Sequence, residues 1–351
     1  MLVKLKWGRM KPLQLGIIGA GRIGKVHART VSLHPNAATT VSIADQNRDA
    51  AEDVARLYGI PNVVPEARQV FANPEIDAVL ICSSTNTHAE FIIQAAKAGK
   101  HIFCEKPIDY DLLRIDAALE AVNRWGVKLQ IGFNRRFDAN FARVRKAIET
   151  GEIGTPRLLH IISRDPAPPP ISYVKVSGGM FFDMTIHDFD MARFLIQDEV
   201  EEIYTAAGVM VDPEIGKAGD VDTAVITLRF RNGVIGTIDN SREAVYGYDQ
   251  RVEVLGSKGS IATGNNYPNQ AVISTAKGIR RDLPLNFFME RYADSFSDEL
   301  RAFIKSVREN KPTLVTGDDA RYPVLMGMAA LRSHQERRPV KIEEVAEVAT
   351  R

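Results

Sequence analysis

The sequence predicts an α/β chain of two domains: a doubly wound parallel sheet, followed by an α+β domain with a largely antiparallel open sheet. Three observations lead to this prediction. Short runs that are apolar throughout alternate with helix-length amphipathic segments as far as residue 134, which is typical of a parallel sheet covered on both faces. Beyond residue 134, β-rich runs follow one another and a hairpin signal joins two of them. A length of 351 residues also allows each domain its own core.

The N-terminal domain is expected over residues 11–134. Its strands should be the wholly apolar runs, and its helices the segments with apolar residues at helical spacing. The expected strands are Leu13–Ile18, Thr40–Ala44, Ala78–Ile81, His101–Cys104 and Leu129–Gly132. The expected helices between them are Ile23–Leu33, Arg48–Tyr58, Ala89–Ala98 and Leu112–Trp125. Repeated units of this kind imply right-handed crossovers between parallel strands.

The second domain is expected over residues 135–351. Arg231-Asn232-Gly233 is a strong hairpin signal between two β-rich runs. The segment Arg164–Ser177 should be a loop, because its prolines oppose regular structure. The expected strands are Arg157–Ser163, Thr223–Phe230, Val234–Ser241, Gln250–Leu255, Gly259–Thr263 and Ala271–Ser274, and the helices are Ala139–Thr150, Phe182–Leu195, Ser297–Arg308 and Asp318–Gln335. The last two helices are expected to pack back on the first domain.

Composition argues against several classes of protein. The formal net charge is +1, without a long run of one sign, so the chain lacks the basic footprint of a general nucleic-acid binder. No apolar stretch approaches the roughly 20 residues that span a bilayer. Residues 1–10 carry basic side chains but no apolar core, which indicates an N-terminal extension rather than a signal peptide, with Met10 as a possible natural start.

The chain has two cysteines, too few for a disulfide framework at this length. Cys82 and Cys104 fall at the ends of predicted buried strands, so both are expected to be core thiols. This usage fits a reducing compartment, and a cytoplasmic location is expected.

A glycine-rich turn directly follows the first predicted strand. The residues Gly19-Ala20-Gly21-Arg22-Ile23-Gly24 match G-x-G-x-x-G and begin a predicted helix. Its glycines permit a tight turn and let backbone N–H groups approach a pyrophosphate, to which the helix N-terminus adds partial positive charge. An ordinary strand–helix turn is the alternative, but the context favours a dinucleotide site. The residues expected at the cofactor are Gly19, Gly21, Arg22, Ile23 and Gly24.

An acidic residue ends the second predicted strand. Asp45 is placed to accept hydrogen bonds from ribose hydroxyls and to repel a 2′-phosphate, so it predicts NAD rather than NADP. A turn or helix cap is its alternative role, and the nearby Arg48 is compatible with a 2′-phosphate. The loop after the next central strand should also face the cofactor through Ser83, Thr85, Asn86 and His88, although a cap or core-edge position is the alternative for each.

Lys106 follows the strand His101–Cys104, whose carboxyl end should open on the same crevice. Oxidation of a secondary alcohol needs a base near neutrality and a positive group beside the forming alkoxide. A lysine at this point can donate to a substrate hydroxyl and stabilise that charge. Lysines at strand ends are usually surface charges, but Pro107 fixes the chain just after Lys106, which favours a defined geometry.

Asp183 and His187 lie four residues apart on a predicted helix, so their side chains should share a face. A carboxylate beside an imidazole favours its charged form and orients the ring, as a general base requires. On spacing alone, a structural Asp–His pair is the slightly better explanation. A metal site that includes Asp190 is a further alternative, but no cluster with zinc-ligand spacing supports it, and no metal is expected.

Together these motifs resemble the Gfo/Idh/MocA oxidoreductases over residues 11–340, and within them the inositol 2-dehydrogenases. The likeness rests on Gly19–Gly24, Glu105-Lys106-Pro107 and the segment Gly178–Asp190, and on Gly132–Asp138 and Tyr246–Asp249. It implies a Rossmann domain and a second domain whose sheet mediates a homotetramer. It also implies NAD-dependent oxidation of a cyclic polyol, most similar to the conversion of myo-inositol to 2-keto-myo-inositol.

The resemblance also implies roles for individual residues. His187 is expected to be the general acid/base, Asp183 its partner, and Lys106 the residue that bridges cofactor and substrate, with Glu105 beside it at the cofactor. The residues expected at the polyol are Lys106, Arg135, Asp165, Asp183, His187, Asp190 and Tyr248. A dehydrogenase of another inositol isomer or sugar, and a catalytically silent NAD-binding regulator on the same fold, are the alternatives.

Overall fold

The computed structural model describes residues 11–346, and the predicted N-terminal extension therefore lies outside the described residues. The chain divides into two compact units. Unit 1 comprises the chain up to Phe133 together with Phe296–Arg321, and unit 2 comprises Asn134–Ser295 and the chain from Tyr322 onward. Among residues 11–346, no helix combines the length and apolar character that crossing a bilayer requires.

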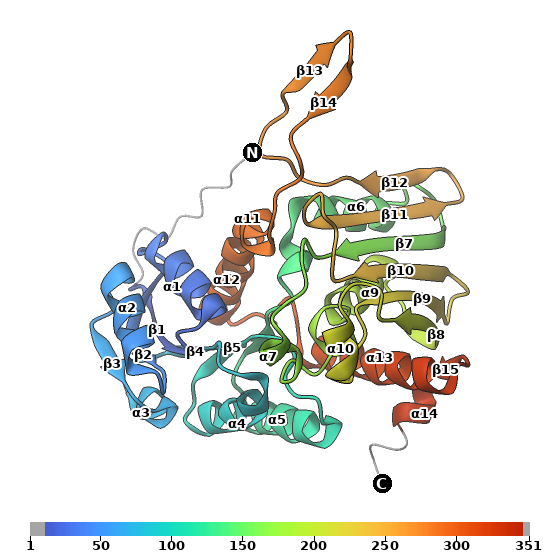
Figure 1. Ribbon diagram of the computed structural model, residues 1–351. Helices are drawn as coiled ribbons and strands as arrows, with labels where there is room; N and C mark the ends of the chain where they lie inside the picture. The colour runs from blue at the N-terminus through green and yellow to red at the C-terminus, as the bar shows by residue number, and fades with distance from the viewer. Residues whose placement is uncertain (1–10, 347–351) are drawn as a thin grey trace. The chain divides into compact units, whose positions relative to one another are not determined.

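Unit 1 is built around a six-stranded parallel sheet with strand order β3-β2-β1-β4-β5-β6 (Figure 1). Its strands are β1 Leu13–Ile18, β2 Ala38–Ala44, β3 Asn62–Val64, β4 Ala78–Ile81, β5 His101–Cys104 and β6 Leu129–Ile131. Its helices are α1 Arg22–Ser32, α2 Arg48–Tyr58, α3 Ala67–Ala72, α4 His88–Lys97 and α5 Leu112–Trp125, with η1 Thr85–Thr87. The strand order reverses between β1 and β4, as in a doubly wound sheet, so this prediction is confirmed.

Apolar side chains pack on both faces of this sheet. One buried cluster joins the sheet to α1, α2 and α12 (Ala293–Arg308), and α4 and α5 lie on the opposite face (Figure 1). The members of the cluster that come from β1 and these helices include Leu13, Leu15, Ile17, Ala28, Val31, Ala51, Val54, Leu300, Phe303 and Ile304. Cys82 and Cys104 are free, buried thiols, as predicted.

Unit 2 contains a seven-stranded sheet with the order β12-β11-β7-β10-β9-β8-β15. Its strands are β7 Pro156–Arg164, β8 Val200–Gly208, β9 Thr223–Phe230, β10 Ile235–Ser241, β11 Asp249–Gly256, β12 Ser260–Thr263 and β15 Val340–Lys341. Only β7 and β10 pair in parallel, so the prediction of a largely antiparallel sheet is confirmed. Because β7 and β10 run in the same direction, the residues after them meet at one edge of the sheet.

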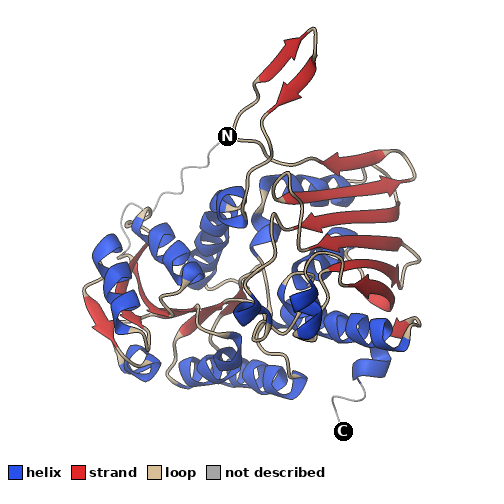
Figure 2. Ribbon diagram, in the orientation of Figure 1, coloured by secondary structure: helices blue, strands red, loops and turns tan. Residues whose placement is uncertain are grey.

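Helices line one face of this sheet (Figure 2). The helices of unit 2 are α6 Ala139–Glu149, α7 Ile171–Val174, α8 Met180–Asp183, α9 Ile186–Ile196, α10 Pro213–Lys217, α11 Phe288–Arg291, α14 Ile342–Ala346 and most of α13 Gly317–Glu336, with η2 Asn134–Phe137. Burial alternates residue by residue along β9, so the other face of the sheet is open. A separate hairpin is formed by β13 Val272–Thr275 and β14 Gly278–Arg281.

Two predictions of local structure in unit 2 were wrong. The helix expected over Phe182–Leu195 is two helices, α8 and α9. Between them the backbone forms hydrogen bonds across three residues instead of four, as in a 3₁₀ turn. The His187 N–H donates to the Met184 carbonyl at 3.3 Å, and the Asp188 N–H donates to the Thr185 carbonyl at 2.8 Å. The proline-rich loop contains α7, which Pro170 precedes as N-cap. A proline at a helix start removes no intrahelical hydrogen bond, so it permits a short helix there.

The strand β8 was missed because a bulge between Val200 and Glu202 breaks its alternation of apolar and polar residues. The missed strands β3 and β15 have three and two residues, which is too short for a periodic signal. The helix α3 and the strand β14 were missed as well, each with at most six residues.

Candidate active site

The glycine-rich turn of unit 1 joins β1 to α1, and its first and third glycines are required by packing. Gly19 has φ +102°, and a Cβ there would lie 2.5 Å from the Cys82 carbonyl oxygen. A Cβ on Gly24 would lie 2.0 Å from the Gly19 carbonyl oxygen, so this glycine lets α1 approach the turn closely.

Gly21 is different, because a Cβ there would meet no atom within 4 Å. It is the N-cap of α1, and no side chain caps the helix start through a hydrogen bond. Arg22 and Ile23 begin the helix beside this open space. An uncapped N-terminus with open space beside it suits a phosphate group, so these residues fit the pyrophosphate of a dinucleotide.

Asp45 follows β2 and is tied to the glycine turn. Its Oδ2 accepts a hydrogen bond from the Ala20 N–H at 2.6 Å, and its Oδ1 accepts one from the Asn47 N–H at 2.8 Å. The carboxylate thus lies beside the predicted pyrophosphate site and is only partly buried. The structure brings Asp45 and the glycine turn together, as their positions in the sequence predicted.

The loop after β4 is fixed internally. The Ser83 and Thr87 hydroxyls are 2.7 Å apart, Thr85 is partly buried and Asn86 is exposed. His88 is 1% exposed, and its ring nitrogens lie 2.8 Å from the Pro107 carbonyl and 2.9 Å from the Ser83 carbonyl. His88 therefore links this loop to the residue after Lys106.

Lys106 stands out by its exposure. Within the stretch Ile102–Asp109 it is the one residue that is not buried. Glu105 on one side is 8% exposed and Pro107 on the other is buried, with a cis peptide between Lys106 and Pro107. The side chain at the carboxyl end of β5 that reaches the surface is therefore the predicted catalytic lysine.

Asp183 and His187 in unit 2 are likewise more accessible to solvent than the residues around them. In the stretch Met180–Asp190 they are the two residues that are not buried. Asp183 ends α8 and His187 lies in the first turn of α9, so the turn between these helices carries both polar groups. The buried frame leaves only an acid and a histidine partly accessible, an arrangement that suits a catalytic pair.

Two residues that the sequence reasoning missed hold Asp183. The Tyr173 hydroxyl donates to Asp183 Oδ1 at 2.8 Å, and Arg242 Nη1 donates to Asp183 Oδ2 at 3.0 Å. Arg242 follows β10, and its Nη1 lies 3.6 Å from Oδ2 of Asp165, which follows β7. The parallel pairing of β7 and β10 thus places Asp165 and Arg242 side by side, and Arg242 connects them to Asp183 at the end of α8. Nothing in the sequence indicated this strand pairing.

Asp165 has an unusual protonation equilibrium. Burial raises the pKa of its carboxyl group to about 6, because the charged form loses hydration, and the Asp183 carboxylate adds to the rise while Arg242 opposes it. Asp165 therefore changes charge near neutral pH.

The remaining predicted polyol residues take part in buried networks. Arg135 donates to Asp188 Oδ1 at 2.5 Å and to the Tyr248 hydroxyl at 3.4 Å, and Arg135 and Tyr248 are 5% and 6% exposed. Asp190 is fully buried and accepts from Nε and Nη2 of Arg136. The structure thus joins Arg135 to Tyr248 and Asp165 to Asp183, whereas Asp190 belongs to a separate ion pair. Their contacts with a polyol stay predictions.

Sequence models of two protein domains match the chain. Residues 13–133 match an oxidoreductase family with an NAD-binding Rossmann fold, and residues 141–262 match the GFO/IDH/MocA C-terminal domain. The chain belongs to the Gfo/Idh/MocA oxidoreductase family. The predicted resemblance is confirmed, and NAD is the cofactor of this Gfo/Idh/MocA enzyme.

Individual members of the Gfo/Idh/MocA family resemble the chain over nearly its whole length. It is 49% identical to the myo-inositol 2-dehydrogenase of Thermotoga maritima, an alignment that covers 95% of this chain and 99% of that protein. It is 46% identical to the inositol 2-dehydrogenase of Rhizobium meliloti, with 94% and 99% covered. The solved structure of scyllo-inositol dehydrogenase from Lactobacillus casei, with bound NAD(H) and scyllo-inositol, has a TM-score of 0.89 at 28% identity, covering 95% of this chain and 100% of that chain.

Two substitutions in the glycine turn, one at Gly21 and one at Gly24, separate a role in NAD binding from a role in packing. Gly21→Ala should leave the thermal midpoint close to that of the parent but weaken NAD binding about 10-fold, because the added methyl group occupies the open space beside the helix start. Gly24→Ala should lower the midpoint, since its methyl group meets the Gly19 carbonyl. Calorimetry and NAD titration measure both. Equal effects of the two substitutions on stability would contradict the assignment.

Proposed function

We propose that the chain oxidises one ring hydroxyl of an inositol with NAD, and that the reaction converts myo-inositol to 2-keto-myo-inositol. The observation that carries the proposal is the exposure of Asp183 and His187 from an otherwise buried stretch, in a chain 49% identical to a myo-inositol 2-dehydrogenase. In the overall reaction the alcohol carbon loses a hydride, the hydroxyl oxygen loses a proton, and a ketone forms.

His187 is proposed to take the hydroxyl proton as a general base. Asp183, at the end of α8 and held by Tyr173 and Arg242, is proposed to orient the imidazole and to stabilise its charged form. Lys106 is proposed to donate to the same oxygen and to stabilise the developing alkoxide. NAD, when bound, accepts the hydride.

The other polar residues of unit 2 are proposed to recognise the ring hydroxyls. Asp165 and Arg242 lie at the edge where β7 and β10 end, beside Asp183, and supply an acceptor and donors. Arg135 and Tyr248 are proposed to support this edge from the buried side. Asp190 is proposed to contribute to polyol binding indirectly, through its ion pair with Arg136.

The identity of the inositol is tested with a panel of substrates. Purified protein is incubated with NAD and, separately, myo-inositol, scyllo-inositol, chiro-inositol and glucose, and NADH absorbance is followed. The highest kcat/KM is expected for myo-inositol. A higher value for scyllo-inositol would assign the sister activity, and no reduction of NAD with any of these compounds would reject the proposed function. A parallel series with NADP tests the role of Asp45, which predicts a preference for NAD.

The pH dependence tests Asp165. Its pKa of about 6 means that it gains a proton as the pH falls through that value, when an acceptor for the polyol is lost. The acidic limb of log kcat/KM should therefore include a fall near pH 6 in the parent, and this contribution should be absent from Asp165→Asn, whose side chain carries no titratable proton. Identical limbs in the two proteins would contradict a role for Asp165.

We also infer a homotetramer assembled through the open face of the seven-stranded sheet. Five large apolar side chains on strands of this sheet are 40–52% exposed, whereas most large apolar side chains elsewhere in the unit are buried. These residues are Leu158, Tyr204, Val225, Ile235 and Leu255. Light scattering should give four times the chain mass of 38.9 kDa, and the mass of one chain would reject the inference. A cytoplasmic location is part of this proposal, consistent with the two free thiols.

A further inference from the structure

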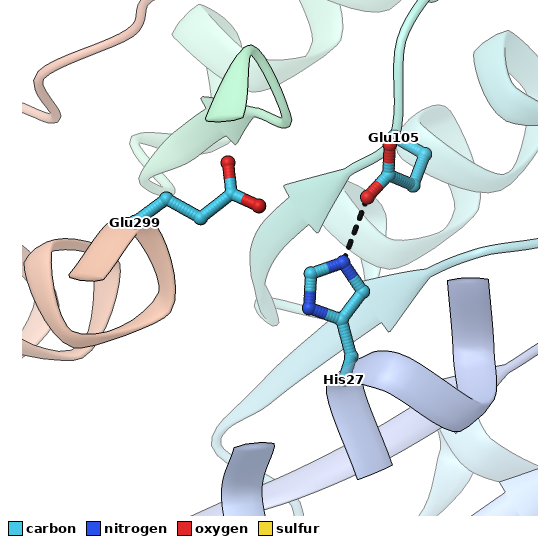
Figure 3. A group of neighbouring side chains, drawn as sticks. All are labelled: His27, Glu105 and Glu299. Carbon is cyan, nitrogen blue, oxygen red and sulfur yellow. Dashed lines mark hydrogen bonds and ion pairs between the residues drawn. The ribbon is translucent and has the colours of Figure 1, made fainter. Parts of the chain in front are cut away.

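A cluster of three titratable side chains lies inside unit 1: His27, Glu105 and Glu299 (Figure 3). His27 comes from α1, Glu105 follows β5, and Glu299 comes from α12. One nitrogen or oxygen atom from each lies within 4.8 Å of the others, and the residues are 0%, 8% and 0% exposed. No other group of three or more His, Cys, Asp or Glu side chains comes this close among residues 11–346.

Glu105 is held firmly in this cluster. His27 Nε2 and Glu105 Oε1 are 2.7 Å apart, so they share a hydrogen bond. On another side, the carboxyl group lies against Gly132, where a Cβ would come within 3.0 Å of its Cδ and Oε2. The His27 ring is itself fixed by edge-on contacts with Phe103 at 4.9 Å and Phe296 at 6.1 Å between ring centroids. Glu105, the residue before Lys106, is therefore held in place by His27 on one side and Gly132 on the other.

Glu299 has no such hydrogen bond. Both of its carboxyl oxygens are buried and have no hydrogen-bond partner among residues 11–346. Figure 3 shows the carboxyl group directed toward the space beside the His27 ring and Glu105. An ionised carboxylate in that position would lose its hydration without compensation, which costs several kcal/mol or more. It would also repel the Glu105 carboxylate.

We propose that His27 and an un-ionised Glu299 are positioning residues for the Glu105 carboxylate and, through it, for the backbone of Lys106 at the NAD site. His27 holds the carboxylate by a hydrogen bond, and Glu299 fills the space beside them without adding a charge (Figure 3). The role assigned to Lys106 rests on the proposed function. Burial raises the pKa of the Glu299 carboxyl group well above its usual range, and the neighbouring Glu105 raises it further, in agreement with the geometry. A neutral Glu299 adds no negative charge beside the hydrogen bond between His27 and Glu105.

A divalent cation held by the three residues is the competing explanation of the cluster. The distance of 2.7 Å between His27 Nε2 and Glu105 Oε1 favours a shared proton, because a cation would need both atoms as ligands. Elemental analysis of the purified full-length chain should therefore find no stoichiometric metal. One zinc, manganese or iron per chain would overturn the proposal.

Infrared spectroscopy tests the protonation of Glu299 without reference to activity. At pH 8 the full-length chain should show the carbonyl stretch of a protonated carboxylic acid, which shifts in D2O. The band should be absent from Glu299→Gln. A spectrum of the parent that lacks this band, or a band that persists in Glu299→Gln, would overturn the assignment of the proton to Glu299.

NAD titration calorimetry tests the positioning role. His27→Ala should weaken NAD binding about 10-fold, since a hydrogen bond to a charged group is lost, and His27→Gln, which retains an N–H donor, should recover most of the affinity. Glu299→Ala should also weaken NAD binding, because it leaves a cavity beside His27 and Glu105, whereas the neutral, equally sized Glu299→Gln should retain most of the parent's affinity. Parent-like NAD affinity in both alanine variants, or Glu299→Gln as damaging as Glu299→Ala, would overturn the proposal.

These measurements separate the proposal from the proposed function. NAD affinity, the infrared band and the metal content need no turnover of a polyol. A parent protein that oxidised no inositol would reject the proposed function, while the two pairs of variants would still decide whether His27 and Glu299 position the NAD site.

Discussion

Replacing His187 by alanine should lower kcat for inositol oxidation by about 10²- to 10⁴-fold, the usual contribution of a general acid–base residue. The variant loses the group proposed to take the hydroxyl proton. Its fold should change little, because His187 is one of two residues in Met180–Asp190 that are not buried. The measurement is NADH formation at saturating NAD and inositol.

NAD affinity provides the control for this variant. Residues 13–133 match the NAD-binding domain, and His187 lies in the other unit, so the dissociation constant for NAD should stay within about twofold of the parent value. A kcat within about threefold of the parent would reject His187 as the base. A loss of NAD binding together with kcat would show damage outside the chemical step.

Replacing Lys106 by methionine should lower kcat about 10²- to 10³-fold, because a donor to the developing alkoxide is removed while the length of the side chain is kept. Lys106 is the single residue of Ile102–Asp109 that is not buried, so the substitution adds no buried charge and opens no cavity. The readout is kcat at saturating substrates, with stability followed by thermal unfolding.

Lys106→Arg is the matched control for charge. It keeps the positive charge but changes its shape and position, so it should recover only part of the lost activity. If Lys106→Met oxidised inositol at nearly the parent rate, the lysine would be a surface charge, which is the ordinary role of a lysine at a strand end.

The fold of unit 1 could be predicted well because its signals are local. The observed bounds match those that hydrophobic periodicity indicated for three largely apolar strands and two helices, namely Leu13–Ile18, Ala78–Ile81, His101–Cys104, Arg48–Tyr58 and Leu112–Trp125. The glycine turn was recognisable because only glycine fits the positive φ at position 19 and the close approach at position 24.

The arrangement of the candidate site depends on contacts between distant segments, and these were not predictable from spacing. Tyr173 lies in a proline-rich segment and Arg242 at a strand end, and neither belongs to a motif, yet both hold Asp183. The hydrophobic period over Phe182–Leu195 indicated one helix, because periodicity carries no signal for the tightened turn at Met184-Thr185, where Thr185 Oγ1 donates to Asn240, 55 residues away.

The exposure of the site residues was equally hidden from the sequence. Spacing alone slightly favoured a structural pair for Asp183 and His187, and it favoured a surface charge for Lys106. In the structure each of the three residues is partly accessible to solvent within a stretch that is otherwise buried, so its accessibility distinguishes it from its neighbours. His27 and Glu299 carried no sequence signal, because the three residues of the cluster come from distant parts of the chain, with Glu105 lying 78 residues from its partner His27.

The central claim is that a hydride passes from a ring carbon of inositol to NAD, and isotope transfer measures this step directly. Myo-inositol that carries deuterium on the ring carbon at position 2 is incubated with the full-length chain and NAD, and the NADH formed is examined by mass spectrometry. The account predicts NADH that has gained one deuterium, together with the matching ketone. NADH without deuterium, or no NADH at all, would contradict it.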